Sequence, residues 1–196
     1  MLLPDLSNVS YRPMSDTKKE WTCVKQESGP DLKLFRARFD HMLNPRNQQT
    51  ERMIILESPD SVNVVPITSK GEIIFVRQFR FGIQAYTLEL PGGIVDPGEE
   101  HSIAAKRELQ EETGYTTQDW SYLGKIASNP VFMDSYIHHW VAKDVELTHE
   151  ISLDAGEDVE WVALSIEDVR TELLQGGFEH PHAVNALLLF FGKQLF

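Results

Sequence analysis

Residues 92–115 read GGIVDPGEEHSIAAKRELQEETGY, a glycine-rich loop followed by a segment with helical periodicity. We expect a helix over residues 101–113, because apolar residues recur there at helical spacing. Gly114 follows, and a glycine at this position favours a helix end with positive φ. Four residues of this segment could face a core: Ile103, Ala104, Leu109 and Thr113.

Three carboxylates share one face of this expected helix. Glu108, Glu111 and Glu112 stand at positions i, i+3 and i+4, where like charges repel by roughly 0.2–0.5 kcal/mol per pair. One interpretation is a solvated acidic face. The other is a magnesium site, because a hard divalent cation removes the repulsion and takes carboxylate, water and phosphate oxygens as ligands. The glycine-rich loop could direct backbone carbonyl groups across the same face.

Arg107 directly precedes Glu108, and we expect it to point to a different side of the helix. There it can pair with Glu99, folded back from the loop, and so fix the loop to the helix. The alternative is a free surface arginine, which applies only if the loop does not fold back.

The composition limits the classes of function. The 196-residue chain has 18 basic and 30 acidic side chains, a net charge of −12. Such a surface repels nucleic acid and anionic lipid, so a small phosphate ester would need a cation to approach it. The chain has one cysteine, Cys23, no signal-peptide pattern at its start and no apolar run long enough to span a membrane. These features predict a cytoplasmic protein.

The rest of the chain is rich in expected strands. Before about residue 57, we expect antiparallel strands that include 21–24 and 32–39, with turns at 28–30 and 44–46. Further strands are expected at 53–56, 62–68, 72–79, 84–90, 122–127, 136–142 and 159–164. Two helices close the chain, 166–175 after the N-cap signal at Ser165, and 182–194. We expect an N-terminal β-rich region over 1–57 and a main domain over 58–196.

Segment 92–115 resembles the Nudix box, G-x5-E-x7-R-E-U-x-E-E-x-G-U, where U is a bulky apolar residue. Every fixed position is matched: Gly93, Glu99, Arg107, Glu108, Leu109, Glu111, Glu112, Gly114 and Tyr115. A match of this length is specific, and it strongly disfavours the solvated acidic face.

The sequence around the box resembles the Nudix enzymes that cleave ADP-ribose and other nucleoside diphosphate sugars. The similar segments are 63–66, 76–80, 88–93 and the pair Asn129-Pro130. The resemblance implies an α+β fold, with an α/β/α sandwich around a mixed β-sheet and an added N-terminal antiparallel β region. It also implies a homodimer, often domain-exchanged, through the N-terminal region.

The same resemblance implies roles for individual residues. Metal binding falls to the Gly92 carbonyl and to the carboxylates of Glu108, Glu111 and Glu112. Glu99 and Arg107 would hold the loop against the helix. Substrate contact falls to Arg80, Arg77 and Glu89. Because side chains three apart in a strand leave on opposite faces, we expect only one of the two arginines to reach the site.

The general base has several candidates. In this subgroup an acidic residue in a loop before a late strand often takes the proton, and here that loop is 152–159. The chain has Ala155 where the subgroup has an acidic residue. Glu157 is the preferred base, and Asp154 or a glutamate of the box, such as Glu111, is the alternative. The other interpretation of Glu157 is a solvated loop acid.

The histidines at 138–139 and at 180 and 182 could suggest zinc. Adjacent strand residues point to opposite faces, however, and the chain offers no cysteine cluster, so we do not expect a structural zinc site.

These observations predict a Mg²⁺-dependent enzyme, with Mn²⁺ able to substitute. It would hydrolyse the pyrophosphate bond of a nucleoside diphosphate sugar such as ADP-ribose or GDP-mannose, giving a nucleoside monophosphate and a sugar phosphate. One alternative is hydrolysis of another nucleoside diphosphate derivative, a dinucleoside polyphosphate or a coenzyme. A second is a non-catalytic Nudix-fold ligand sensor, which the complete set of box carboxylates disfavours. We expect neither a nucleic-acid nor a membrane partner.

Overall fold

The computed structural model of the chain describes residues 19–153, 156 and 158–193. The chain divides into two compact units, Met1–Leu56 and Glu57–Phe196. Among the described residues, no helix is both long enough and apolar enough to cross a lipid bilayer.

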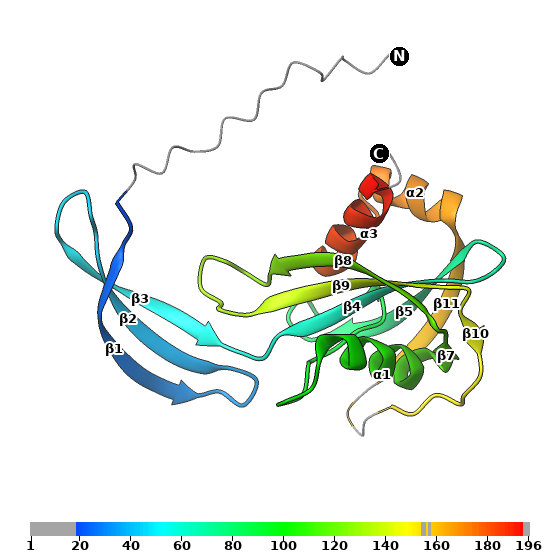
Figure 1. The fold of residues 1–196 in the computed structure, drawn as a ribbon, viewed down its shortest axis with the longest axis horizontal. Helices are drawn as coiled ribbons and strands as arrows, with labels where there is room; N and C mark the ends of the chain where they lie inside the picture. Colours follow the sequence, from blue (N-terminus) through cyan, green and yellow to red (C-terminus); the bar gives the residue numbers. More distant parts are fainter. Residues whose placement is uncertain (1–18, 154–155, 157, 194–196) are drawn as a thin grey trace, which may run out of the picture. The chain divides into compact units, whose positions relative to one another are not determined.

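The first unit is a three-stranded sheet (Figure 1). Its strands are hydrogen-bonded in chain order: β1 (Thr22–Asp31), β2 (Arg36–Leu43) and β3 (Thr50–Glu57). β1 and β2 pair antiparallel. The expected turn at 44–46 lies between β2 and β3, where the Asn44 side chain accepts a hydrogen bond from the Arg46 N–H. The expectation of an added N-terminal β region is confirmed.

The turn between β1 and β2 differs from the sequence expectation. Residues 28–30, expected to form a turn, lie inside β1, where the pairing register shifts between Ser28 and Asp31. The turn occupies 32–35 instead, the start of the strand expected at 32–39. There the Asp31 carboxylate accepts a hydrogen bond from the Lys33 N–H at 2.8 Å, and Lys33 has a φ of +70°. A side chain that bonds to the backbone two residues on favours a turn over strand pairing.

The second unit contains a mixed sheet and three helices. Its elements in chain order are β4 (Ser61–Ile67), β5 (Glu72–Arg80), β6 (Ala85–Glu89), α1 (His101–Thr113), β7 (Tyr115–Thr116), β8 (Asp119–Ala127), β9 (Tyr136–Lys143), β10 (Glu146–Leu147), β11 (Val159–Ser165), α2 (Ile166–Gln175) and α3 (Pro181–Lys193). Six strands form one sheet in the order β11-β5-β4-β9-β8, with β6 paired to β5. β4 and β9 are parallel and the other pairs are antiparallel. The expected mixed sheet is therefore confirmed.

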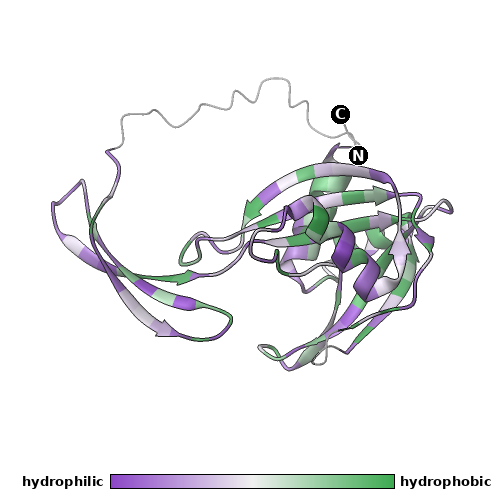
Figure 2. Cartoon of the chain, turned by 60° about the horizontal axis from the view of Figure 1, so that its bottom comes forward, coloured by the Kyte–Doolittle hydropathy of each residue, from purple (hydrophilic) through white to green (hydrophobic). Residues whose placement is uncertain are grey.

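Helix α1 covers one face of this sheet. Ala104 and Leu109 of α1 are fully buried in a cluster with Val62 and Val64 of β4. Burial of apolar area at about 25 cal/mol per Å² stabilises this contact and so fixes the helix that carries the box carboxylates. The central strands carry runs of consecutive buried residues, 62–66 in β4 and 73–76 in β5, as expected for strands that are covered on both faces. Figure 2 shows hydrophobic residues gathered in the strands of this sheet.

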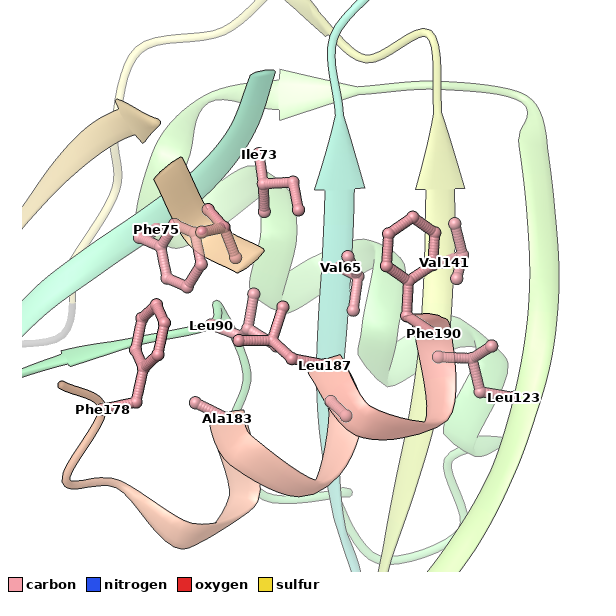
Figure 3. Packing of buried hydrophobic residues seen from close by; sticks show 12 residues of the cluster. Val65, Ile73, Phe75, Leu90, Leu123, Val141, Phe178, Ala183, Leu187 and Phe190 are labelled. Carbon is pink, nitrogen blue, oxygen red and sulfur yellow. The ribbon is translucent and has the colours of Figure 1, made fainter. Parts of the chain in front are cut away.

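Helix α3 covers the other face. Leu187 and Phe190 of α3 pack over Val65 of β4 (Figure 3). Phe178, which precedes α3, stacks on Phe75 of β5 with ring centroids 5.3 Å apart. With helices on both faces, the second unit has the expected α/β/α sandwich.

The helices agree closely with the sequence expectation, and the short strands do not. α1 and α2 have the expected bounds, α3 begins one residue earlier than expected, and its expected last residue, Gln194, lies outside the described residues. Gly114 ends α1 with a φ of +73°. Ile103 is 56% exposed, so the expectation that it faces a core is wrong. The sequence does not predict the pair β7 and β10, because two-residue strands carry no periodicity.

Candidate active site

The glycine-rich loop lies directly against strand β4. The Val62 N–H donates to the Gly93 carbonyl, and the Val64 N–H donates to the Pro91 carbonyl, both at 2.9 Å. A Cβ at Gly92 would lie 2.1 Å from the Val62 carbonyl oxygen. Only glycine permits this approach of two backbones, so the sequence at Gly92 fixes the position of the loop.

Two carboxylates of α1 are buried under this loop. Glu108 is 8% exposed and Glu112 is 4% exposed. Glu112 Oε2 accepts a hydrogen bond of 2.9 Å from the Gly92 N–H. A Cβ at Gly93 would lie 2.4 Å from Glu108 Oε1, so this carboxylate also meets the loop backbone. The Glu111 side chain is 41% exposed.

Arg107 joins the loop to these carboxylates. Its guanidinium donates to both Glu99 oxygens, at 3.1 and 3.0 Å, and to the Ile94 carbonyl at 3.0 Å. It also donates to Glu108 Oε1 at 2.7 Å and to Glu111 Oε2 at 3.2 Å. The loop thus folds back as expected. The expectation that Arg107 points away from the carboxylate face is wrong, because its long side chain reaches both neighbours on the helix.

The electrostatics follow from these contacts. The hydrogen bonds that Arg107 donates to Glu99 outweigh its partial burial and raise the pKa of Arg107, so it stays charged. The same hydrogen bonds lower the pKa of Glu99. The site therefore holds a fixed cation, Arg107, beside the ionised carboxylate of Glu99.

The donor set suits a hard divalent cation. In the part of the chain that the structure describes, no three His, Cys, Asp or Glu side chains are arranged to hold a metal ion by themselves. Mg²⁺ needs fewer, because it binds through one or two carboxylates and completes its shell with water and phosphate oxygens. Glu108 and Glu112 supply buried carboxylate oxygens one helical turn apart, beside the backbone of Gly92 and Gly93. These residues fit such an ion.

Arg80 and Glu89 form a bidentate ion pair just before the loop. Arg80 Nε and Nη2 each lie 2.6 Å from a Glu89 oxygen. The Thr87 hydroxyl also donates to Glu89, and His180 Nε2 lies 3.3 Å from Glu89 Oε2. Burial alone would raise the pKa of Glu89, but the hydrogen bonds from Arg80 and Thr87 outweigh it and the pKa is lowered.

Arg77 contacts other residues. Its guanidinium lies over the Tyr86 ring, 4.9 Å from the centroid. Arg77 and Tyr86 line a shallow pocket of about 210 Å³ with Asp158 and Glu160. The two arginines are thus not brought together, in agreement with the alternation expected along a strand.

The loop before β11 carries two of the candidate bases. Glu157 and Asp154, like Ala155, lie outside the described residues. Their neighbour Asp158 accepts a hydrogen bond of 3.3 Å from the Tyr86 hydroxyl.

Sequence reasoning missed the partners of the histidines. His138 and His139 do point to opposite faces: His138 contacts Asp60 at 3.1 Å and Tyr122 at 2.9 Å, whereas His139 is fully buried. Burial and the neighbouring His182 lower the pKa of His139 to about 4. The contact of His180 with Glu89 has no signal in the local pattern either, since it joins the start of α3 to β6.

Comparison with known proteins agrees with this arrangement. Residues 57–186 match the NUDIX domain. The chain is 34% identical over 153 residues to an ADP-ribose pyrophosphatase of Bacillus subtilis (strain 168), covering 76% of this chain and 80% of that protein. It is also 34% identical over 123 residues to a methanol dehydrogenase activator of Bacillus methanolicus, covering 62% of this chain and 66% of that protein.

A solved structure of an ADP compounds hydrolase superimposes with a TM-score of 0.79 at 26% identity, covering 91% of this chain and 96% of the other. The sandwich with its added N-terminal sheet is thus shared over almost the whole chain. Together with the matched domain, this likeness shows that the chain belongs to the Nudix hydrolase family.

Proposed function

We propose that the chain hydrolyses the pyrophosphate bond of a nucleoside diphosphate sugar, with ADP-ribose as the first candidate. The observation that carries this proposal is the junction of loop and helix at Arg107, which holds Glu99, Glu108 and Glu111 together beneath the glycine loop. The relative named ADP-ribose pyrophosphatase and the solved structure of an ADP compounds hydrolase support this substrate class. The products would be a nucleoside monophosphate and a sugar phosphate.

Mg²⁺ is the proposed cofactor, and Mn²⁺ could replace it. The proposed ligands are the Gly92 carbonyl, Glu108, Glu111 and Glu112. When bound, such a cation neutralises the diphosphate and supplies Lewis-acid activation of water. The acidic surface makes this neutralisation necessary, because a chain of net charge −12 repels a free diphosphate.

The chain's own residues would bind and orient the substrate. Arg80, whose side chain is 41% exposed, would contact the diphosphate, since a planar guanidinium can bind two phosphate oxygens at once. Arg107 and Glu99 would keep the loop against the helix. Water attacks one phosphorus, the bridging P–O bond breaks, and the water proton passes to a carboxylate. We keep Glu157 as the preferred acceptor of this proton, with Asp154 and Glu111 as alternatives.

We further propose a homodimer formed through the N-terminal unit. That unit exposes several apolar side chains: Trp21, Val24, Leu32, Leu34, Met53 and Ile54. Exposed apolar side chains concentrated in one small unit favour an interaction surface. A cytoplasmic location is also proposed, on the basis that the single cysteine is unpaired.

A substrate panel tests the function directly. The purified chain is incubated with Mg²⁺ and ADP-ribose, GDP-mannose, a dinucleoside polyphosphate or a coenzyme, and the products are separated by chromatography. We expect AMP and ribose 5-phosphate from ADP-ribose at the highest kcat/KM. A preference for a dinucleoside polyphosphate or coenzyme would move the enzyme to another Nudix class. Binding without turnover of any substrate would favour the ligand sensor instead.

A further inference from the structure

The Glu89 carboxylate is surrounded by donors from three parts of the fold. It is 2% exposed. Arg80 of β5 donates to both of its oxygens, Thr87 of β6 donates to Oε1, and His180 lies against Oε2. A carboxylate held in this way is saturated with partners from the protein itself. Glu89 is therefore better suited to hold Arg80 than to bind the substrate, the role that the resemblance implied for it.

His180 is held rigidly where it meets Glu89. Its carbonyl accepts the first helical hydrogen bond of α3, from the Val184 N–H, and Pro181 follows at the first helical position. Two residues earlier, Phe178 stacks on Phe75 in the core. Both sides of His180 are thus anchored, so little conformational entropy is lost when its ring contacts Glu89.

The protonation state of His180 makes this contact attractive. Burial lowers its pKa, against the attraction of Glu89, so the imidazole is neutral near pH 7 and carries one N–H. With the proton on Nε2, the positive end of the N–H dipole lies beside Glu89, since Nε2 is 3.3 Å from Oε2. With the proton on Nδ1, a lone pair would face the carboxylate and repel it. The neighbouring charged and titratable groups are Glu89, Arg80 and His182.

We propose that His180 is a positioning residue for the substrate site, which holds Glu89 in place and through it sets the orientation of Arg80. This rests on the proposed function, in which Arg80 contacts the diphosphate of a nucleoside diphosphate sugar. The last helix, which packs on the sheet face opposite α1, is then part of the substrate-binding apparatus. A planar guanidinium binds phosphate well only in a defined orientation, and the bidentate pair with Glu89 supplies that orientation.

Steady-state kinetics with ADP-ribose and Mg²⁺ test this, in the full-length chain. Arg80→Ala should raise KM about tenfold or more, as expected for the loss of a charge-assisted contact. His180→Leu should raise KM about threefold with kcat within a factor of about two, because it loosens Arg80 without removing it. His180→Gln should restore the parent KM, since its side-chain amide presents a donor close to the position of Nε2. When His180→Leu is added to Arg80→Ala, KM should rise no further than in Arg80→Ala alone.

Two further variants separate positioning from general stability. Thr87→Val removes another donor to Glu89 and should raise KM as much as His180→Leu does. This variant therefore tests the proposal even if the His180→Leu protein does not fold. His182→Leu is the matched control, because His182 packs on the His180 ring with centroids 5.1 Å apart. It should change the melting temperature but not KM.

The outcomes distinguish the two proposals. If the parent enzyme does not cleave nucleoside diphosphate sugars, the proposed function fails. If the parent cleaves them but Arg80→Ala leaves KM unchanged, the substrate contact of Arg80 fails, and the positioning role of His180 fails with it. If Arg80→Ala raises KM while His180→Leu leaves it unchanged, the positioning role of His180 is overturned. It is also overturned if His180→Gln is as impaired as His180→Leu, or if His180→Leu has its full effect in the absence of Arg80.

Discussion

The backbone N–H of Gly92 donates a hydrogen bond to Oε2 of Glu112 at 2.9 Å, across 20 residues of sequence. This contact closes the glycine loop onto the first helix of the second unit. It places a buried carboxylate where the loop backbone passes strand β4, and the proposed catalytic chemistry depends on this closure.

Glu112→Gln tests the carboxylate itself. The amide oxygen can still accept the hydrogen bond from Gly92, so the fold should persist, but the negative charge for a cation is lost. We expect kcat to fall by about a hundredfold or more. The melting temperature of the metal-free protein should be unchanged or slightly higher, because repulsion among the glutamates falls. Near-normal turnover would contradict the role proposed for Glu112.

Arg107→Ala should release the loop. The change removes a cation that contacts both Glu99 and the buried Glu108, which should cost about 2 kcal/mol of stability. Hydrogen exchange across residues 92–99 should become faster, and substrate binding should weaken. Arg107→Lys is the control, since it keeps the charge but cannot span Glu99 and Glu111 with one planar group. Lost activity with unchanged loop protection would show that Arg107 does not support the loop.

Gly92→Ala should displace the loop from β4. The added Cβ would lie 2.1 Å from the Val62 carbonyl oxygen, so the backbone must move. We expect a loss of roughly 2 kcal/mol or more in urea unfolding, together with lost activity. Gly82→Ala is the matched control, because its Cβ would meet nothing within 4 Å. If both variants unfold at the same urea concentration as the parent protein, the close approach at Gly92 does not contribute to the free energy of unfolding.

Stability should fall as the pH is lowered through the range in which His139 titrates. Its pKa in the folded protein is about 4, against an ordinary value of 6.5. Below about pH 6.5 the unfolded chain binds a proton at His139 that the folded chain does not bind. The contribution of neutral His139 to stability is therefore complete above about pH 6.5 and is lost progressively between pH 6.5 and 4. The loss should reach about 3 kcal/mol. His139→Leu should flatten this part of the profile. An unchanged slope in that variant would assign the acid sensitivity to other groups.

The N-terminal unit should mediate assembly. Light scattering at micromolar concentration should give a mass near twice the 22.4 kDa of one chain. Removal of residues 1–43 should abolish both the dimer and sugar-nucleotide cleavage, although the box remains intact. Ile54→Lys, which places a charge at a residue that is 49% exposed, is the milder test and should weaken the dimer. A monomeric parent, or a truncated monomer with full activity, would contradict this assignment.

The sequence by itself determined the elements whose signals are local. The apolar spacing and Gly114 defined both ends of α1, and the side chain of Ser165 caps α2 by accepting from the Asp168 N–H as its pattern predicts. The spacing of Glu108, Glu111 and Glu112 alone places three carboxylates on one helical face. These features depend on residues within a few positions of each other, so the chain specifies them without reference to the rest of the fold.

Only the tertiary structure decided which groups these side chains meet. The Gly92 N–H donates to Glu112, which lies 20 residues further along the chain, and Arg107 donates to the Ile94 carbonyl of the loop. The contact of His180 with Glu89 joins elements far apart in the chain. Such contacts arise because packing of the helices on the sheet brings distant backbone segments together, and burial then makes each polar group select a partner that local periodicity does not encode.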